Sequence, residues 1–149
     1  MELRDILEYT NTNPSTWLAT VENGRPRVRG MLMWFADETG FYYHTGDKKR
    51  LCRQLMANPY VEAGFFNPGT GPDFSMVRVR GKVEFVQDKA LEEKLFADRP
   101  WLHDNLRAMA DKNMTVKIFR IASGEAEMWN MSVNGREMDQ QPIVFGAGS

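Results

Sequence analysis

Two short basic segments contain the residues best suited to bind a ligand. The first is the strand-like run 25–35, in which alternate residues share one face. That face changes along its length from guanidinium groups to apolar side chains: Arg25, Arg27, Arg29, Met31, Met33 and Phe35. Guanidinium groups bind phosphate, and apolar side chains can lie against a flat ring. The face therefore suits a long ligand with a phosphate at one end and a heterocycle at the other. The alternative is an edge strand with hydrated arginines.

The second segment is Thr45-Gly46-Asp47-Lys48-Lys49-Arg50, which we expect between a strand and the first turn of a helix. A helix N-terminus has unpaired N–H groups and the positive end of the helix dipole, so it favours an anion. Lys49 and Arg50 would oppose that dipole unless an anion lay between them. The turn is therefore a candidate phosphate site, and the alternative is a basic surface exposed to water.

Strands are the main elements expected to position these segments. Alternation and strand-forming residues predict strands at residues 17–21, 27–35, 41–44, 60–66, 76–86, 115–121 and 125–131. Asn23-Gly24 favours a tight hairpin turn, and Ala122-Ser123-Gly124 is expected to join the last two strands as a pair. On the even face of the arginine strand, Val28, Leu32 and Trp34 are expected in the core.

Helices are expected in four places. They cover residues 2–10 and the segments that follow Asp47, Asp88 and Pro100, and we expect Asp47 and Asp88 to cap the N-termini of their helices. The apolar stripe of the second helix consists of Leu51, Cys52, Leu55 and Met56. Antiparallel hairpins with segregated helices indicate an α+β or mainly-β barrel rather than a sheet of alternating βα units.

Composition limits the class of function. The 149 residues carry a formal net charge of −1, which gives no bulk reason to bind nucleic acid or an anionic membrane surface. Cys52 is the single cysteine, and the two histidines, His44 and His103, lie far apart, so neither an internal disulfide nor a metal site is expected. The N-terminal residues have the pattern of neither a signal peptide nor a membrane span, and we expect a cytoplasmic protein.

Beyond these local features, the order of segments resembles the FMN-binding core of the pyridoxamine 5′-phosphate oxidase-like family. The resemblance covers residues 17–131 and lies in three stretches, WLATVENGRPRVRGMLMWF, FYYHTGDKKRLCRQLMANPYVEAGFF and VRVRGKVEF. It implies a six-stranded antiparallel split β-barrel with Greek-key-like connections and peripheral helices, forming one FMN-binding domain over residues 1–149. It also implies a homodimer whose cofactor sites lie at the subunit interface.

Carried over position by position, the resemblance implies nine cofactor-binding residues. It places Arg29 near the flavin phosphate, together with Lys49 and Arg50 of the basic turn. The main chain of Gly30-Met31-Leu32 would pass along the isoalloxazine ring. The pair His44-Thr45 would border the ring and the ribityl chain.

The ninth residue is Trp129, which resembles the aromatic residue that the partner subunit lends to the site. Two positions depart from the family pattern: Leu51 replaces a frequent lysine and Met76 replaces a glutamine, so polar contacts to the ring edge are not carried over. The true oxidases have a C-terminal arginine and histidine pair, and no histidine follows Trp129, which argues against vitamin B6 oxidation. Arg136 could contact FMN or a substrate, or lie at the surface.

The resemblance implies a flavoprotein, and we expect an FMN-dependent oxidoreductase that acts on a small molecule, with reduced nicotinamide as a candidate electron donor. A non-catalytic flavin carrier or redox sensor is the alternative, as is a related barrel that binds deazaflavin or haem. The polar face of residues 76–86, with Arg78, Arg80 and Lys82, could pair with acidic residues or bind a ligand. No side chain is assigned a catalytic role from the sequence.

Overall fold

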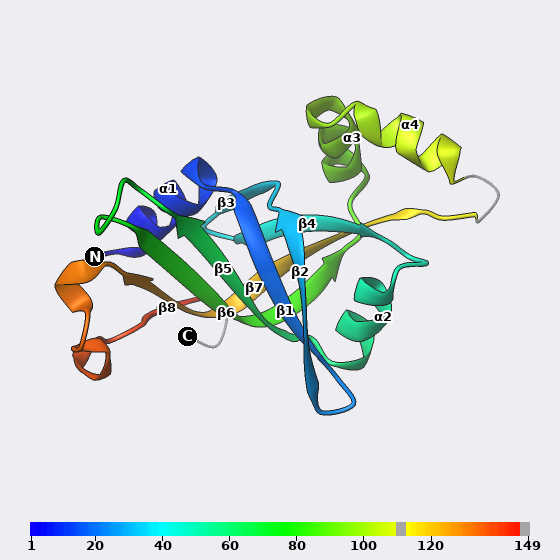
Figure 1. Ribbon diagram of the computed structural model, residues 1–149. Coiled ribbons are helices and arrows are strands. Elements are labelled where there is room, and N and C mark those ends of the chain that lie inside the picture. Colours follow the sequence, from blue (N-terminus) through cyan, green and yellow to red (C-terminus); the bar gives the residue numbers. More distant parts are fainter. Residues whose placement is uncertain (110–112, 147–149) are drawn as a thin grey trace.

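The fold is built around one open antiparallel sheet (Figure 1). The computed structural model describes residues 1–109 and 113–146. Its strands are β1 (Ser15–Glu22), β2 (Arg25–Leu32), β3 (Phe35–Asp37), β4 (Gly40–Gly46), β5 (Tyr60–Asn67), β6 (Ser75–Val86), β7 (Val116–Trp129) and β8 (Ile143–Phe145). Their order across the sheet is β2-β1-β5-β6-β7-β4-β3, with β8 paired to β7. β2 and β3 therefore lie at the two ends of this order, and β8 adds a short edge beside β7.

This architecture confirms the split-barrel α+β fold expected from the sequence. The six long strands β1, β2 and β4 to β7 form the curved sheet, and two three-residue strands, β3 and β8, extend it. β1 lies between β2 and β5, and β4 pairs with β7, so neighbours in the sheet are often distant in the chain. The β1–β2 hairpin turns at Asn23 and Gly24, whose φ angles of 53° and 74° suit the expected tight turn.

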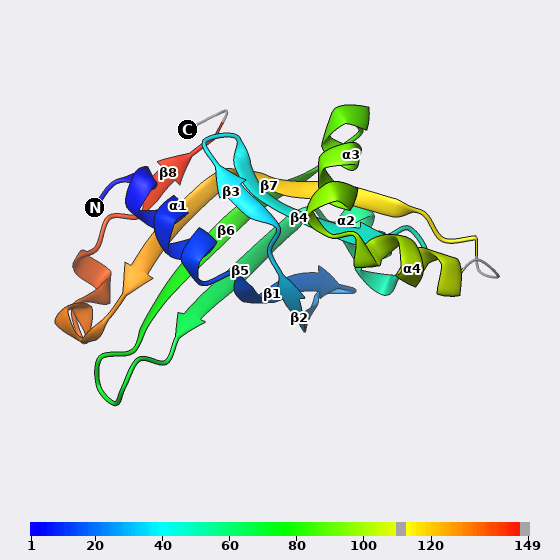
Figure 2. The ribbon, with the colours of Figure 1, turned by 90° about the horizontal axis from the view of Figure 1, so that it is seen from above.

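Helices gather at two ends of the sheet (Figures 1 and 2). α1 (Leu3–Thr12) packs on β3, β6 and β7 at the end that also holds the 3-10 helices η2 (Met131–Val133) and η3 (Glu137–Asp139). α2 (Arg50–Ala57), α3 (Lys89–Asp98) and α4 (Trp101–Ala108) lie at the other end. Within residues 1–109 and 113–146, no helix has the length and apolar character needed to cross a membrane.

The two predicted helix caps have different outcomes. Asp88 caps α3 by accepting a hydrogen bond from a first-turn backbone N–H at 3.0 Å, as expected. Asp47 does not cap α2, because Lys49 occupies the N-cap position. Instead, the Asp47 carboxylate accepts the backbone N–H of Thr115 at 2.8 Å, and this bond lowers the pKa of Asp47. The basic turn is thereby tied to the chain that leads into β7.

The concave face of the sheet forms the main core with α1. Its largest fully buried side chains include Leu18, Tyr43, Phe65 and Phe119. The rings of Tyr43 and Phe119 are stacked at 5.4 Å between centroids. The alternation predicted for residues 76–86 is confirmed here, since Val77, Val79 and Val83 are buried on this face.

The opposite face of the sheet is open and partly apolar. Trp17 of β1 and Val28 and Leu32 of β2 are 64%, 63% and 52% exposed. The prediction that Val28 and Leu32 belong to the core is therefore wrong: the even positions of this outermost strand lie on the open face. Met56 of α2 is also exposed, and Gln54 is buried in that helix instead.

The rest of the open face carries paired charges. Arg78 of β6 forms an ion pair with Glu127 of β7, and Arg80 pairs with Glu125 at 2.9 Å and with Glu127 at 3.2 Å. Of the two roles considered for the polar face of residues 76–86, cross-strand pairing is the one observed for these two arginines.

The expected final hairpin is wrong, because residues 116–129 form the single strand β7. At Ser123-Gly124 the strand stays paired with β6 beside a register shift at Lys82/Val83, and Gly124 lies opposite Gly81. A Cβ atom on Gly124 would lie 2.0 Å from the carbonyl oxygen of Arg80, and φ at Gly124 is +155°. This glycine marks a close backbone approach inside a strand rather than a turn.

We expect Gly124→Ala to destabilise the fold by about 3 kcal/mol or more, because the new methyl group meets backbone that cannot move aside. Gly24→Ala is the matched control, since Gly24 also has a positive φ but no heavy atom lies within 4 Å of a Cβ built there. It should cost only about 1–2 kcal/mol for the backbone conformation. Urea unfolding measures the loss of stability in each variant. Equal losses would show that the backbones of β6 and β7 are not in close contact at Gly124.

Candidate functional site

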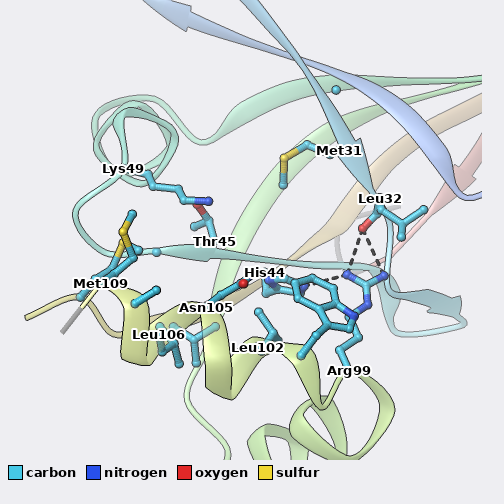
Figure 3. A pocket seen from close by; sticks show the side chains of 16 residues that line it. Met31, Leu32, His44, Thr45, Lys49, Arg99, Leu102, Asn105, Leu106 and Met109 are labelled. Atoms are coloured by element: carbon cyan, nitrogen blue, oxygen red, sulfur yellow. Dashed lines mark hydrogen bonds between the residues drawn. The ribbon is translucent and has the colours of Figure 1, made fainter. Parts of the chain in front are cut away.

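A cavity of about 460 Å³ opens between the sheet and the helical arm α3–α4 (Figure 3). The ends of β2 and β4 form its sheet side, the basic turn before α2 forms one edge, and α4 faces them. The chain thus brings the end of the arginine strand and the basic turn to one place, although they are separated by β3 and most of β4 in the sequence.

Six of the nine sequence-predicted cofactor residues line this cavity. They are Gly30, Met31, Leu32, His44, Thr45 and Lys49. Arg29 and Arg50 line a second depression of about 490 Å³, which lies farther along β2 beside α2. Trp129 lies far from both at the opposite end of β7, where it stacks on Phe74 and donates to Glu137 at 2.9 Å.

Arg29 is held by a buried polar network. Its guanidinium donates to the carbonyl oxygen of Leu18 at 3.1 Å and to the side-chain oxygen of Gln54. The same oxygen of Gln54 accepts from Thr20 at 2.7 Å, and the Gln54 amide donates to Glu22 at 3.1 Å. Burial lowers the pKa of Arg29. The network keeps one arginine of the strand in a defined place beside the depression, and the sequence alone did not identify Gln54 as its anchor.

The buried hydroxyl of Thr45 is an unsatisfied polar group in the wall of the cavity. Thr45 is 4% exposed, and its Oγ1 has no hydrogen-bond partner among the described residues. Buried polar atoms are normally satisfied, so such an exception calls for a missing partner. Figure 3 shows Lys49 extending toward Thr45 from the basic turn. A ligand oxygen atom could bind both groups.

His44 is paired with Arg99, a residue that the sequence analysis did not select. Nη1 of Arg99 lies 2.7 Å from Nε2 of His44, and the guanidinium also donates to the carbonyl oxygens of Leu32 and Met33 (Figure 3). The pKa of His44 is lowered to about 4, chiefly by burial and then by the charges of Arg99 and Lys49. His44 therefore stays neutral at physiological pH. An arginine at a helix end carries no sequence signal for such a role.

The wall formed by α4 is largely apolar. Leu102, Leu106 and Met109 line it, and Asn105 supplies an amide (Figure 3). Leu102 is buried in a small cluster with Leu95 of α3. This wall suits a flat, uncharged ring, while the polar groups of the site lie on the β4 and basic-turn side. Among the described residues, no cluster of histidine, cysteine and carboxylate side chains could hold a metal ion.

The open sheet and its strand order define a split-barrel protein, whose cavity is cationic at one edge and apolar at the other. Residues 2–129 match the family model described as pyridoxamine 5′-phosphate oxidase, and the chain belongs to this family. A pyridoxine/pyridoxamine 5′-phosphate oxidase of Pseudomonas putida is 35% identical over 127 residues, which cover 84% of this chain and 55% of that protein. The chain thus spans about half the length of the curated relatives it matches.

Solved structures share the fold at low sequence identity. A NimC/NimA family protein from Clostridium acetobutylicum has a TM-score of 0.69 and 22% identity, with 95% of this chain and 90% of that chain covered. An FAD-binding protein from Mesorhizobium loti has a TM-score of 0.63 and 22% identity, with 86% and 92% covered.

We expect Thr45→Val to stabilise the ligand-free protein by about 1 kcal/mol, because the substitution removes a buried hydroxyl that makes no hydrogen bond. Thr16→Val is the matched control: Thr16 is equally buried, but its hydroxyl donates to the Met31 carbonyl oxygen at 2.8 Å. The control should lose about 1–2 kcal/mol. Denaturant titrations of the two variants decide the matter, and a loss at position 45 would mean that the hydroxyl is bonded without a ligand.

Proposed function

We propose that this protein binds FMN in the cavity and uses it as an oxidoreductase acting on a small molecule. The observation that carries the proposal is the buried, unpartnered Thr45 hydroxyl in a cavity edged by Lys49. A phosphorylated ligand rich in hydroxyl groups would satisfy both residues. Family membership and the similarity to an FAD-binding protein support a flavin.

The predicted cofactor residues divide into two groups in this proposal. Arg29, Lys49 and Arg50 bind the phosphate. The main chain of Gly30-Met31-Leu32 passes the isoalloxazine ring, and His44-Thr45 borders the ring and the ribityl chain. Bound FMN supplies hydride or electron transfer, while the chain orients it and excludes water. The apolar α4 wall then receives the substrate, with reduced nicotinamide as the candidate electron donor.

The proposal includes a homodimer with the cofactor at the subunit interface. The exposed apolar side chains of Trp17, Val28 and Leu32 lie on adjacent strands of the open face, and contiguous apolar patches commonly mark interfaces. Leu32 lies at the edge of the cavity, so a partner seated on this face would lie next to it. Trp129 is too far along β7 to reach the cavity of its own chain, and as a partner residue it could contribute to the other site.

Vitamin B6 oxidation is not part of the proposal. The chain is taken as one domain over residues 1–149, acting in the cytoplasm, where the single thiol of Cys52 stays reduced.

The visible spectrum of the purified protein tests the cofactor. A yellow protein, or a colourless one that becomes yellow with added FMN, supports a flavin, whereas deazaflavin and haem have different spectra. Anaerobic mixing with reduced nicotinamide should then bleach the flavin, and an added electron acceptor should restore the colour. A protein that refuses FMN at any tested concentration overturns the proposal, and a flavin that no donor reduces points to a carrier or sensor.

The double variant Lys49→Ala/Arg50→Ala should raise the Kd for FMN at least about tenfold, because charge-assisted phosphate bonds contribute roughly 1.5–3 kcal/mol each. Both side chains are exposed, so the fold should be intact. Arg4→Ala/Lys89→Ala removes the same charge from exposed positions elsewhere and should leave the Kd unchanged. Fluorescence titration with FMN measures all three proteins. An unaltered Kd in the first variant would place the phosphate elsewhere.

Trp17→Glu should convert the dimer to a monomer at micromolar concentration, because it puts a charge into the apolar part of the open face. The matched control is Met56→Glu, since Met56 is 74% exposed but lies in α2 and not on the open face of the sheet. Sedimentation velocity should give the 17.2 kDa monomer for the first variant and twice that mass for the second. A monomeric wild type would remove the dimer from the proposal.

A further inference from the structure

The contact between Arg99 and His44 fixes which ring nitrogen can donate a hydrogen bond. A guanidinium has only donors, so at 2.7 Å the Nε2 atom of His44 must be the acceptor. A neutral imidazole with a lone pair on Nε2 carries its proton on Nδ1. In water the other tautomer is the commoner one, so the protein has to impose this arrangement.

Arg99 is well placed to impose it. The residue is 9% exposed, and its Nη2 donates to the Met33 carbonyl oxygen at 2.9 Å, while both Nη atoms lie 3.3 Å from that of Leu32. These bonds leave the guanidinium little freedom to rotate away from His44. The neighbouring carboxylate of Asp98 is bonded to Trp34 and Lys94 instead, each at 2.9 Å.

The pair therefore leaves a buried positive charge in the cavity wall. No ion pair to Arg99 is present in residues 1–109 and 113–146. The groups that face His44 are Arg99 from the end of α3, Lys49 from the basic turn and the indole of Trp101 from α4, so none of them is an anion. The Asp98 carboxylate attracts Arg99 without forming an ion pair with it, and an electron-rich ligand atom nearby would offset more of the cost of burying the cation.

Nδ1 of His44 has no acceptor among the described residues, although His44 lines the cavity. Its proton is therefore available to whatever occupies the cavity. Figure 3 shows His44 between Arg99 on one side and the Thr45 and Lys49 side of the cavity on the other.

We propose that Arg99 is a positioning residue that fixes His44 as the Nδ1–H tautomer, so that His44 donates a hydrogen bond to a carbonyl or carboxylate oxygen of the bound ligand. The tautomer is a property of the chain alone. The ligand part rests on the proposed function, since FMN is the ligand to be tested. The pair thus selects ligands with an acceptor oxygen at this position.

Two-bond proton–nitrogen NMR spectra of the uniformly ¹⁵N-labelled, ligand-free protein test the tautomer directly. The sequence has two histidines, so His103→Gln assigns the signals without further work. The expected pattern for His44 is a protonated Nδ1 and an unprotonated Nε2 at neutral pH. The reverse pattern in the wild type overturns the proposal. In folded Arg99→Met the Nε2–H form should appear, and the ring should protonate at a higher pH than in the wild type. An unchanged tautomer in that variant overturns the role of Arg99.

A double-mutant cycle tests the ligand part with FMN as the probe. His44→Phe should raise the Kd for FMN about three- to tenfold, the effect of one hydrogen bond. Arg99→Met should raise it to a similar extent, and the double variant should be no weaker than His44→Phe, because Arg99 acts through His44. Additive losses would show that Arg99 acts independently and overturn its positioning role. If the wild type binds no FMN, the proposed function and the ligand part fail together, whereas the tautomer is still decided by the NMR spectra.

Discussion

A single guanidinium holds together three parts of the chain that form the cavity. Arg99 follows α3, bonds to carbonyl oxygens at the end of β2 and just beyond it, and bonds to His44 of β4. α3 itself is clamped to the sheet, because Asp98 accepts from the Trp34 indole and Lys94 lies 4.7 Å from the centre of that ring. The α4 wall therefore stands at a set distance from the strands.

The two faces of the sheet differ in burial and in composition. The concave face is filled by α1 and the large buried side chains of β1, β4, β5 and β7, and it supplies the stability of the fold. The open face divides into an apolar part on β1 and β2 and a part with cross-strand ion pairs on β6 and β7. Exposed ion pairs contribute little to stability, so the charged part of the open face on β6 and β7 adds little to the stability of the fold.

Features with a local cause could be predicted from the sequence. The period-two alternation of residues 76–86, the Asn23-Gly24 turn and the Asp88 cap each depend on neighbours a few residues away. Features that depend on tertiary neighbours could not. The sequence alone does not distinguish a glycine in a turn from a glycine such as Gly124, where the backbones of two paired strands come close together. Val28 and Leu32 form an apolar strand face, and the sequence alone does not show whether such a face is buried or exposed.

The site divides in the same way. The basic turn and the arginine strand were recognisable because their cationic side chains cluster in short segments. Arg99 lies 55 residues from His44 along the chain, and no pattern links them. Gln54 was equally hidden, since a glutamine within an amphipathic helix is ordinarily exposed, and only the fold turns it toward Arg29 and Thr20.

The continuity of β7 has a consequence for assembly. Its first residues pair with β4 beside Thr45, and its last residue, Trp129, pairs with Met76 at the far end of β6. Because β7 is one continuous strand, it fixes the distance between the cavity and the Trp129 side chain of the same chain. In the proposed homodimer, a twofold axis that brings one Trp129 to the partner's cavity brings the other Trp129 to the second cavity, so both sites would form in the same step.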